Sequence, residues 1–381
     1  MTRRRMNWFC PGTLAAMLAL GGTGTLIGCE SDAIGLATPE ERAAATTVQH
    51  DEYSKLGYRV DWRGFPAMTP GDTISRLELF GDVVVVQESG SVVTVLEARS
   101  GEQRWSDPVG STLTKFVGMI RDGKKLIVSS QSQAFIYDLE TGALLTKQDL
   151  ALVVDTKPVQ VGSILVYGCS NGQVLGHLLL NGFKQWGSFM TGAINVDPLG
   201  VGIDGTVGMV SQGGDVLFIY GDTGLMRGRG NMYAGTEVAL AASETMLFVA
   251  SVDHSLYAFN RDGASEQWRK RTDEPLKFAP SFHDGRVYCD MGKEGLKCIE
   301  ASTGKELWAN KDVHGTVVGM RNKRLIAWDG ATATSLDPAA GSIIESAKLA
   351  SVSMVKTDKF VDGNMYLAAP SGVVTKLVPR N

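Results

Sequence analysis

A tryptophan recurs along this 381-residue chain at intervals of one or two units of about forty residues. The spacings between the five recurring tryptophans are 43, 81, 82 and 40 residues, and the positions without tryptophan fall near 146, 227 and 346. A fixed period of this length is typical of a repeat protein, in which each unit is one supersecondary element stacked on its neighbours. The five residues are Trp62, Trp105, Trp186, Trp268 and Trp308.

Each unit has the pattern of a meander of short β-strands. In GRVYCDMGKEGLKCIEASTGKELW, residues 285–308, β-branched and aromatic runs alternate with glycine-bounded turns. No segment of the repeat region sustains a 3.6-residue apolar period, which excludes a helical repeat. A turn glycine recurs before seven of these eight positions, at Gly101, Gly142, Gly182, Gly224, Gly263, Gly304 and Gly341.

These units predict an all-β fold, an eight-bladed β-propeller of four-stranded antiparallel blades. Such sheets have two apolar faces, and radial packing around an axis buries both. Eight outer-strand positions give eight blades, although seven remain possible if the weak unit 192–232 is irregular. Residues 56–65 resemble only the last strand of a unit, and residues 351–379 only the first three. We therefore expect the N-terminal strand to close the last blade, with each tryptophan buried against the next blade and its N–H bonded to backbone.

The N-terminus has the pattern of a lipoprotein export signal. Three arginines precede a mostly apolar stretch, and LIGC follows at residues 26–29. This resembles the bacterial lipobox, in which Cys29 would be diacylated and become the mature N-terminus. We expect a signal peptide over 1–28, a lipidated tether over 29–55 and the propeller over 56–381. Within the tether, Thr38, Pro39 and Glu41 predict a short capped helix.

Two motifs that resemble catalytic sites lack the surroundings that their chemistry requires. GCSNG at 168–172 matches a nucleophile elbow, but a strand rather than a helix follows it, so a hairpin turn is expected. GVGIDG at 200–205 matches a dinucleotide-binding turn, but again a strand follows. The five histidines are scattered, and none stands at metal-ligand spacing. We therefore expect no catalytic, cofactor or metal site, and the net charge of −4 argues against nucleic acid as a partner.

Cys289 and Cys298 flank the sequence GKEG at equal distances from its centre. A hairpin turn centred there would place the two residues opposite each other, within the Cα separation that a disulfide allows. In an exported protein this pair is a candidate disulfide, and the alternative is a reduced pair packed inside a blade.

The repeated segments EARSGEQRW, DLETGALLT, NRDGASEQW and EASTGKELW resemble the pyrroloquinoline-quinone-like β-propeller repeat. Together with the lipobox, the length and the eight units, the chain is similar to the BamB-type lipoproteins of the machinery that assembles outer-membrane β-barrels. The resemblance covers nearly all of the mature chain. It implies a non-catalytic scaffold that binds the barrel-forming outer-membrane subunit, and it carries no contact residues over to this sequence.

Three classes of function compete at this point. The scaffold needs no active site; we expect a monomer within a complex, held by its lipid anchor and facing the periplasm, with the outer membrane as the favoured location. A quinoprotein-type dehydrogenase would need calcium ligands and, in many members, vicinal cysteines, and the sequence contains no Cys-Cys pair. A sensor could bind a ligand in the central channel, and nothing in the sequence excludes it. Fold alone does not decide among the three.

Overall fold

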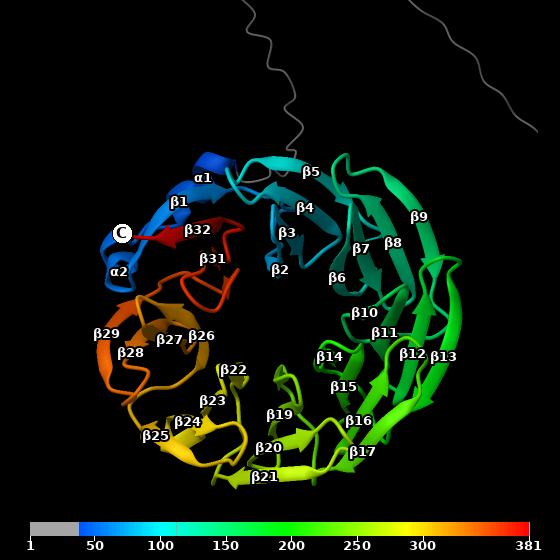
Figure 1. Cartoon of the computed structure of the whole chain (residues 1–381). Coiled ribbons are helices and arrows are strands. Elements are labelled where there is room, and N and C mark those ends of the chain that lie inside the picture. The colour runs from blue at the N-terminus through cyan, green and yellow to red at the C-terminus, as the bar shows by residue number, and fades with distance from the viewer. Residues whose placement is uncertain (1–37, 112, 381) are drawn as a thin grey trace, which may run out of the picture. The chain divides into compact units, whose positions relative to one another are not determined.

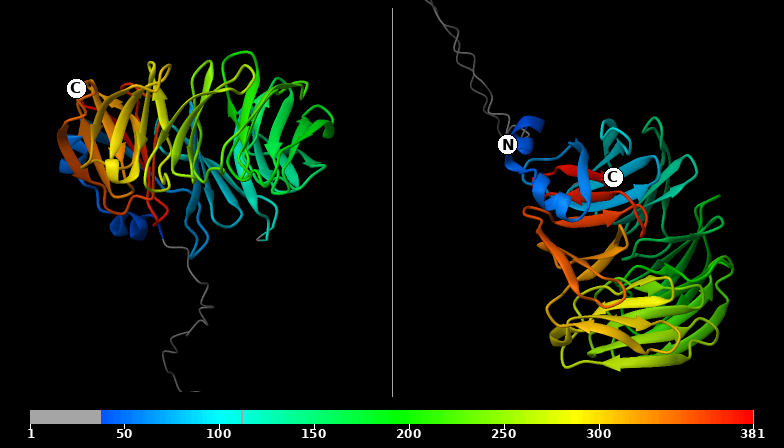
Figure 2. Two further views of the ribbon diagram at one scale, coloured as in Figure 1. Left: turned by 90° about the horizontal axis from the view of Figure 1, so that it is seen from below. Right: turned by 60° about the vertical axis from the view of Figure 1, so that its left-hand side comes forward.

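Eight four-stranded antiparallel sheets are arranged in a closed ring around an open axis (Figure 1). The computed structural model describes residues 38–111 and 113–380. The ring and its eight blades confirm the expected fold, and the unit at 192–232 is a complete blade although its innermost strand has only two residues. Figure 2 shows the ring from two other directions, with the two short helices beside the C-terminal strand.

The strands of the first four blades run from the axis outward in chain order. They are β2(Ile74–Phe80), β3(Val83–Glu88), β4(Val92–Glu97) and β5(Gln103–Pro108) in blade 1; β6(Phe116–Asp122), β7(Lys125–Ser130), β8(Gln133–Asp138) and β9(Leu144–Asp149) in blade 2; β10(Val159–Val161), β11(Ile164–Gly168), β12(Gln173–Leu178) and β13(Phe183–Phe189) in blade 3; and β14(Leu199–Gly200), β15(Thr206–Val210), β16(Asp215–Tyr220) and β17(Met226–Asn231) in blade 4.

The other four blades follow the same order except at the end. They are β18(Ala241–Ala242), β19(Met246–Ser251), β20(Ser255–Asn260) and β21(Glu266–Arg271) in blade 5; β22(Ser281–His283), β23(Arg286–Asp290), β24(Leu296–Glu300) and β25(Glu306–Asn310) in blade 6; β26(Thr316–Arg321), β27(Arg324–Trp328), β28(Thr332–Leu336) and β29(Ile343–Lys348) in blade 7; and β30(Met354–Thr357), β31(Met365–Ala368), β32(Val374–Pro379) and β1(Tyr58–Gly64) in blade 8. The helices are α1(Pro39–Ala45), α2(His50–Lys55) and η1(Gly292–Glu294).

The core of the ring lies between the blades. The middle strands of each blade are buried on both faces, as the burial of every residue of β3 illustrates. One cluster joins Val83 and Val85 of blade 1 to Met119 and Leu126 of blade 2, and similar clusters fill the other seams. Strands buried on both faces have near-continuous apolar sequences rather than alternating ones, which accounts for runs such as VVVV at 83–86.

Each tryptophan lies inside an outer strand and follows a β-bulge. In β5 the pairing shifts between Val95 and Leu96, which leaves Arg104 unpaired immediately before Trp105. The same shift precedes the tryptophans of β13, β21 and β25. A bulge re-aims the next side chain, and here it turns the indole toward the neighbouring blade. Each of these strands begins just after the turn glycine and continues beyond the tryptophan, so the tryptophan lies within the strand and not at its end.

The five indoles pack on equivalent sites of the next blade. We call each site a seat, and it consists of a backbone carbonyl and a turn glycine. Each Nε1–H donates to a backbone carbonyl at 2.8–3.2 Å, and this carbonyl always belongs to the residue three positions before a turn glycine. The glycine has a positive φ, and a Cβ atom added there would lie 2.3–2.7 Å from the indole. The seats are Ala98 with Gly101, Leu139 with Gly142, Gly221 with Gly224, Ala301 with Gly304, and Pro338 with Gly341. The predicted role of the tryptophans is therefore confirmed.

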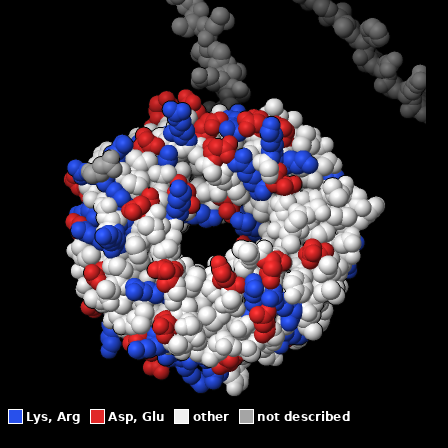
Figure 3. Space-filling model, viewed as in Figure 1, with Lys and Arg blue, Asp and Glu red and all other residues white. Residues whose placement is uncertain are grey.

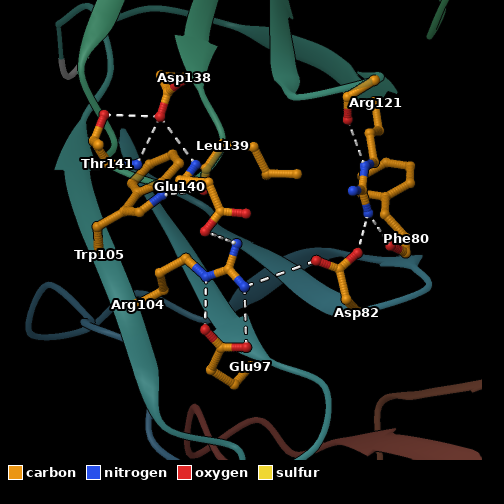
Figure 4. A network of polar contacts seen from close by, with 11 residues as sticks. Phe80, Asp82, Glu97, Arg104, Trp105, Arg121, Asp138, Leu139, Glu140 and Thr141 are labelled. Atoms are coloured by element: carbon orange, nitrogen blue, oxygen red, sulfur yellow. Dashed lines mark hydrogen bonds and ion pairs between the residues drawn. The ribbon is translucent and has the colours of Figure 1, made fainter.

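Ion pairs surround the seat between blades 1 and 2 (Figure 4). Arg104, the bulge residue beside Trp105, pairs with Glu97 at 2.7 Å and with Glu140 of the next blade at 3.2 Å. The carboxylate of Asp138 accepts from the backbone N–H groups of Glu140 and Thr141 and so holds the seat's turn in shape. The bulge thus directs two side chains, one apolar and one charged, across the same seam.

The N-terminal strand closes the last blade, as the sequence predicts. β1 pairs antiparallel with β32 and forms the outer strand of blade 8, and Trp62 of β1 reaches the seat on blade 1. The capped helix is also confirmed: the Thr38 side chain accepts from the Glu41 N–H, the Glu41 side chain accepts from the Thr38 N–H, and Pro39 begins α1. Helix α2 was not expected from the sequence, and residues 38–55, expected to be part of the tether, contact the ring through Arg42, Tyr53 and their neighbours.

Removal of β1 should open the ring. A chain that begins at Thr73 lacks α1, α2 and β1, so β32 would present an unpaired edge and the seat on Gly101 would be empty. We expect soluble aggregates in size-exclusion chromatography and a lower thermal midpoint. The control is a chain that begins at Val48, which keeps α2 and β1 and should remain monomeric. A Thr73 chain that is monomeric and as heat-stable as the control would refute this closure.

The contact between indole and glycine can be separated from backbone strain by a matched pair of variants. Gly341 has φ +69 and lies under Trp308, whereas Gly285 has φ +73 and has no atom within 4 Å of an added Cβ. Both G341A and G285A carry the strain of a positive φ, but only G341A forces the indole to move. We expect G341A to be less stable than G285A by about 1–3 kcal/mol, as in other overpacked cores. Chemical denaturation midpoints measure this, and equal midpoints would show that the seat is not close-packed.

Candidate functional site

Three of the eight seams lack the indole. The bulge register places the empty positions at Thr146 in β9, Gly228 in β17 and Glu345 in β29, because each follows the unpaired residue as the tryptophans do. The sequence pattern had located the last two only approximately, near 227 and 346. Each seam is closed by a different substitute, and the differences decide where the surface of the ring is accessible.

Between blades 4 and 5 the backbones themselves meet. Gly228 forms a parallel bridge with Gly263 of the next blade, and a Cβ on Gly228 would lie 2.5 Å from the Ala264 nitrogen. The bulge residue Arg227 pairs with Asp204 of its own blade and, at 2.5 Å, with Asp262 across the seam. The hydrogen bond from Arg227 holds the pKa of Asp204 at about 2. This seam is closed without an indole.

Between blades 7 and 8 a helix takes the place of the turn that carries the seat in the other blades. Blade 8 has no covalent turn between its third and fourth strands, because these are the two ends of the chain. Helix α2 packs there with Tyr53 and Leu56 buried. The side chains of Glu52 and Gln49 accept from the backbone N–H groups of Lys348 and Ala350, at 2.7 and 3.2 Å, and so cover the end of β29.

Between blades 2 and 3 the inner part of the seam is packed, and its outer edge remains open as a groove of about 970 Å³. Thr146 stands where the indole would be, and the seat is still present as the Leu179 carbonyl and Gly182, with φ +76. Gln148 donates from Nε2 to that carbonyl at 2.8 Å, and its Oε1 accepts from His177 Nε2, also at 2.8 Å. Gln148 therefore replaces the hydrogen bond that an indole would donate to this carbonyl. Because an amide is smaller than an indole, it does not fill the volume that the indole would occupy.

Large apolar side chains surround this groove and are exposed. Leu180 and Phe183, which line it, are 81% and 68% exposed, and Leu144 and Leu145 on β9 are about half exposed. Single exposed apolar residues are normal, but a group beside a concave surface is typical of a binding site. In Figure 3 charged side chains are unevenly spread, with a broad uncharged area on the right, where blades 2 and 3 lie in Figure 1. The groove is the candidate functional site.

A paired charge cluster occupies the inner edge of the ring. Glu78 of β2 bonds Lys157 at 3.0 Å and Lys356 of β30 at 3.3 Å, so that blades 1, 3 and 8 are joined across the axis. Burial lowers the pKa of Lys356, and burial raises the pKa of Asp197, whose carboxylate accepts from the Lys157 N–H. These groups satisfy one another and connect β2 of blade 1 to β30 of the neighbouring blade 8 and to the segment that precedes β10 of blade 3.

The two motifs that resemble catalytic sites lie in connections between strands. Ser170 to Gly172 form the turn between β11 and β12, and Gly172 has φ +82. Residues 201–205 connect β14 to β15 inside blade 4. Among residues 38–111 and 113–380, no three His, Cys, Asp or Glu side chains lie close enough together to hold a metal ion. No helix in that part of the chain is long and apolar enough to cross a membrane. Cys29 lies outside the described residues, so its lipidation stays a prediction.

The disulfide expected between Cys289 and Cys298 is wrong. Both cysteines are free, because Cys298 pairs with Tyr288 and Cys289 with Lys297. The connection from β23 to β24 contains η1 and is centred on Lys293 rather than between two residues, and a one-residue change of register turns a side chain to the other face. Cys289 therefore packs in the seam toward blade 5 and Cys298 in the seam toward blade 7.

Comparison with known proteins identifies the family. A family model described as outer membrane protein assembly factor BamB matches residues 81–226 and 204–374, which is most of the ring. The chain belongs to this family. No curated protein matches it significantly. Similar solved structures include BamB from Moraxella catarrhalis, with a TM-score of 0.64 at 16% identity over 80% of this chain and 96% of that one. The computationally designed protein Ika8 is also similar, with a TM-score of 0.67 at 13% identity over 84% of this chain and 99% of that one. At these identities both structures show the fold alone.

Thiol counting tests the corrected cysteine assignment. Burial raises the pKa of Cys298 to about 11, and Cys289 and Cys169 are also buried with raised pKa values. At neutral pH we expect almost no alkylation of the folded protein at these three residues, and complete alkylation of all three after unfolding without a reductant. If Cys289 and Cys298 react only after reduction, the register described here is not the one in solution.

Proposed function

We propose that this chain is a non-catalytic, lipid-anchored scaffold that binds a protein subunit of an outer-membrane β-barrel assembly complex. The observation that carries the proposal is the family, because the matching model covers both halves of the ring and is described as an outer membrane protein assembly factor. The export signal that ends in LIGC at 26–29 supports attachment to a membrane through Cys29, facing the periplasm.

The physical organisation of the ring suits a scaffold. Its strands are short, its interior is filled by side chains between blades, and the charges at its inner edge are paired, so the ring presents a rigid outer surface. Rigid elements position a binding surface more accurately than loops do. The one large groove described above lies on the outside of this frame, where a macromolecule can reach it.

Affinity purification from bacterial membranes tests the proposal. The full chain, tagged at its C-terminus, is extracted in mild detergent, and the proteins retained with it are identified by mass spectrometry. We expect an outer-membrane barrel-assembly subunit to be enriched over an unrelated tagged lipoprotein. C29A should move the chain from the membrane to the soluble fraction, while the purified variant keeps its thermal midpoint.

The same preparation separates the other classes of function. A quinone released from the denatured protein, together with quinone-dependent oxidation of an alcohol or aldose, would identify a dehydrogenase and overturn the scaffold. Retention of C29A in membranes washed with high salt would show that the anchor lies elsewhere.

A further inference from the structure

The groove between blades 2 and 3 can be compared with five filled versions of itself in the same molecule. At the five indole seams the seat consists of a carbonyl acceptor and a glycine of positive φ three residues later. The groove contains the same two parts, Leu179 and Gly182. Among residues 38–111 and 113–380, no large ring reaches the glycine, because the strand position that would bring one is Thr146. The shape that the seat accepts is therefore known from its copies: a flat aromatic side chain.

Gln148, the side chain that covers the seat, is held by hydrogen bonds to the Leu179 carbonyl and to the buried His177, but it packs on the glycine less closely than an indole does. Gln148 lies 3.3 Å from where a Cβ on Gly182 would be, whereas the indoles lie at 2.3–2.7 Å. An incoming indole N–H can take over the bond to the Leu179 carbonyl. The released Gln148 amide remains beside a wide groove and can be solvated there, at the cost of its hydrogen bond to the buried His177.

The groove also has an unpaired strand along one side. Four consecutive residues of β9, 146–149, line it, and β9 pairs with β8 on one edge only. An exposed strand edge takes up an extended segment by backbone hydrogen bonds, and pockets beside it select alternate side chains. The contrast is β29, whose end is covered by α2.

The charges that line the groove determine which charge on a partner segment is favoured. Lys125, Lys147 and Lys184 line it, and none of the three forms an ion pair with another described residue. Asp122 and Asp149 are the acidic residues of the lining, and the Asp149 carboxylate accepts from the Gln133 side chain. The Lys147 ammonium lies over the Phe135 ring, 5.5 Å from its centroid, so Lys125 and Lys184 are the cations that remain for a partner. Two such lysines against Asp122 favour an acidic segment, which lysines at a rim attract without requiring a fixed geometry.

We propose that this groove binds an extended, acidic segment of a partner protein that inserts one aromatic side chain, with tryptophan the best fit, into the seat of Leu179 and Gly182. Leu180 and Phe183 cover the segment from the outside, and the lysines bind its carboxylates. The inference rests on the proposed scaffold function for its partner, and it adds the place and the chemistry of the contact.

A synthetic peptide tests the site directly. The probe is a short fluorescein-labelled peptide with alternating Val and Thr, one central Trp and Asp or Glu at both ends, and its binding to the purified chain is followed by fluorescence anisotropy. We expect at least about tenfold weaker binding when the Trp is replaced by Ala, as for a buried anchor residue. We also expect weaker binding when Lys replaces the acidic residues. Equal affinity for the Trp and Ala peptides would overturn the proposal.

Variants of the chain place the binding at this seam. T146W supplies the missing indole from the protein itself and should abolish peptide binding while the thermal midpoint stays the same or rises. L180S/F183S removes the exposed apolar cover, and the matched control L225S/M226S changes exposed apolar residues at the start of the outer strand of blade 4, where Met226 is 63% exposed. We expect about tenfold weaker binding for the first pair and no change for the second. Binding that is equally strong in both would overturn the proposal even if T146W fails to fold.

Affinity purification with the same variants separates this inference from the proposed function. If wild type and L180S/F183S retain the same assembly subunit equally, the scaffold function stands and the groove is not its binding site, which overturns the inference. If the peptide binds at the groove but no assembly subunit is retained by any variant, the groove stands as a peptide site and the proposed function fails.

Discussion

The stability of this ring depends on one repeated contact, an indole of one blade seated on a glycine turn of the next. Three local features have to coincide for it: a bulge that turns the side chain out of its own sheet, a turn residue without Cβ, and a free carbonyl three residues before that glycine. Replacing a buried Trp by Ala typically costs about 3–5 kcal/mol, so each seat is among the strongest contacts in its seam. Because the seats join blades rather than strands, they determine how the sheets are placed around the axis.

A closed ring also needs a seam where the last blade meets the rest. Blade 8 contains both ends of the chain, so it lacks the covalent turn that joins the third and fourth strands of the other blades. Noncovalent substitutes replace the missing turn. Arg321 donates from Nε to the Gly57 carbonyl at 3.0 Å and pairs with Asp362 at 2.8 Å. The connection from β30 to β31 crosses to blade 7, where the Asp362 N–H donates to the Met320 carbonyl. Helix α2, this connection and β1 together bind the two ends of the chain to the ring, which explains why residues 50–66 behave as part of the propeller.

The repeat made most of this fold predictable from the sequence. The spacing of the tryptophans and glycines is enough to count the blades, and residues 56–65 could be recognised as a lone outer strand because they match only one part of the unit. Local chemistry predicted α1, since Thr38, Pro39 and Glu41 satisfy the capping rules without tertiary help. The cysteine pairing failed because it depended on one residue of register in a single hairpin, and the 3₁₀ turn after Met291 could not be recognised from its composition. Helix α2 lacks a side-chain cap, and tertiary burial of Tyr53 stabilises it instead.

The sequence does mark the groove, by the missing tryptophan at position 146, but the structure is needed to interpret that mark. Three positions lack tryptophan, and the pattern alone treats them alike. The structure distinguishes them, because Gly228 lets two backbones meet, α2 covers the strand that carries Glu345, and only Thr146 leaves its seat without a comparable filling. Since apolar side chains of both blades still fill the inner part of this seam, its outer edge can stay open at a cost that the fold tolerates. A missing repeat residue whose neighbours keep the complementary parts, here Leu179 and Gly182, is therefore better interpreted as a vacant site than as degeneration of the repeat. The same comparison applies to any propeller: the filled seams define what the open one is shaped to bind.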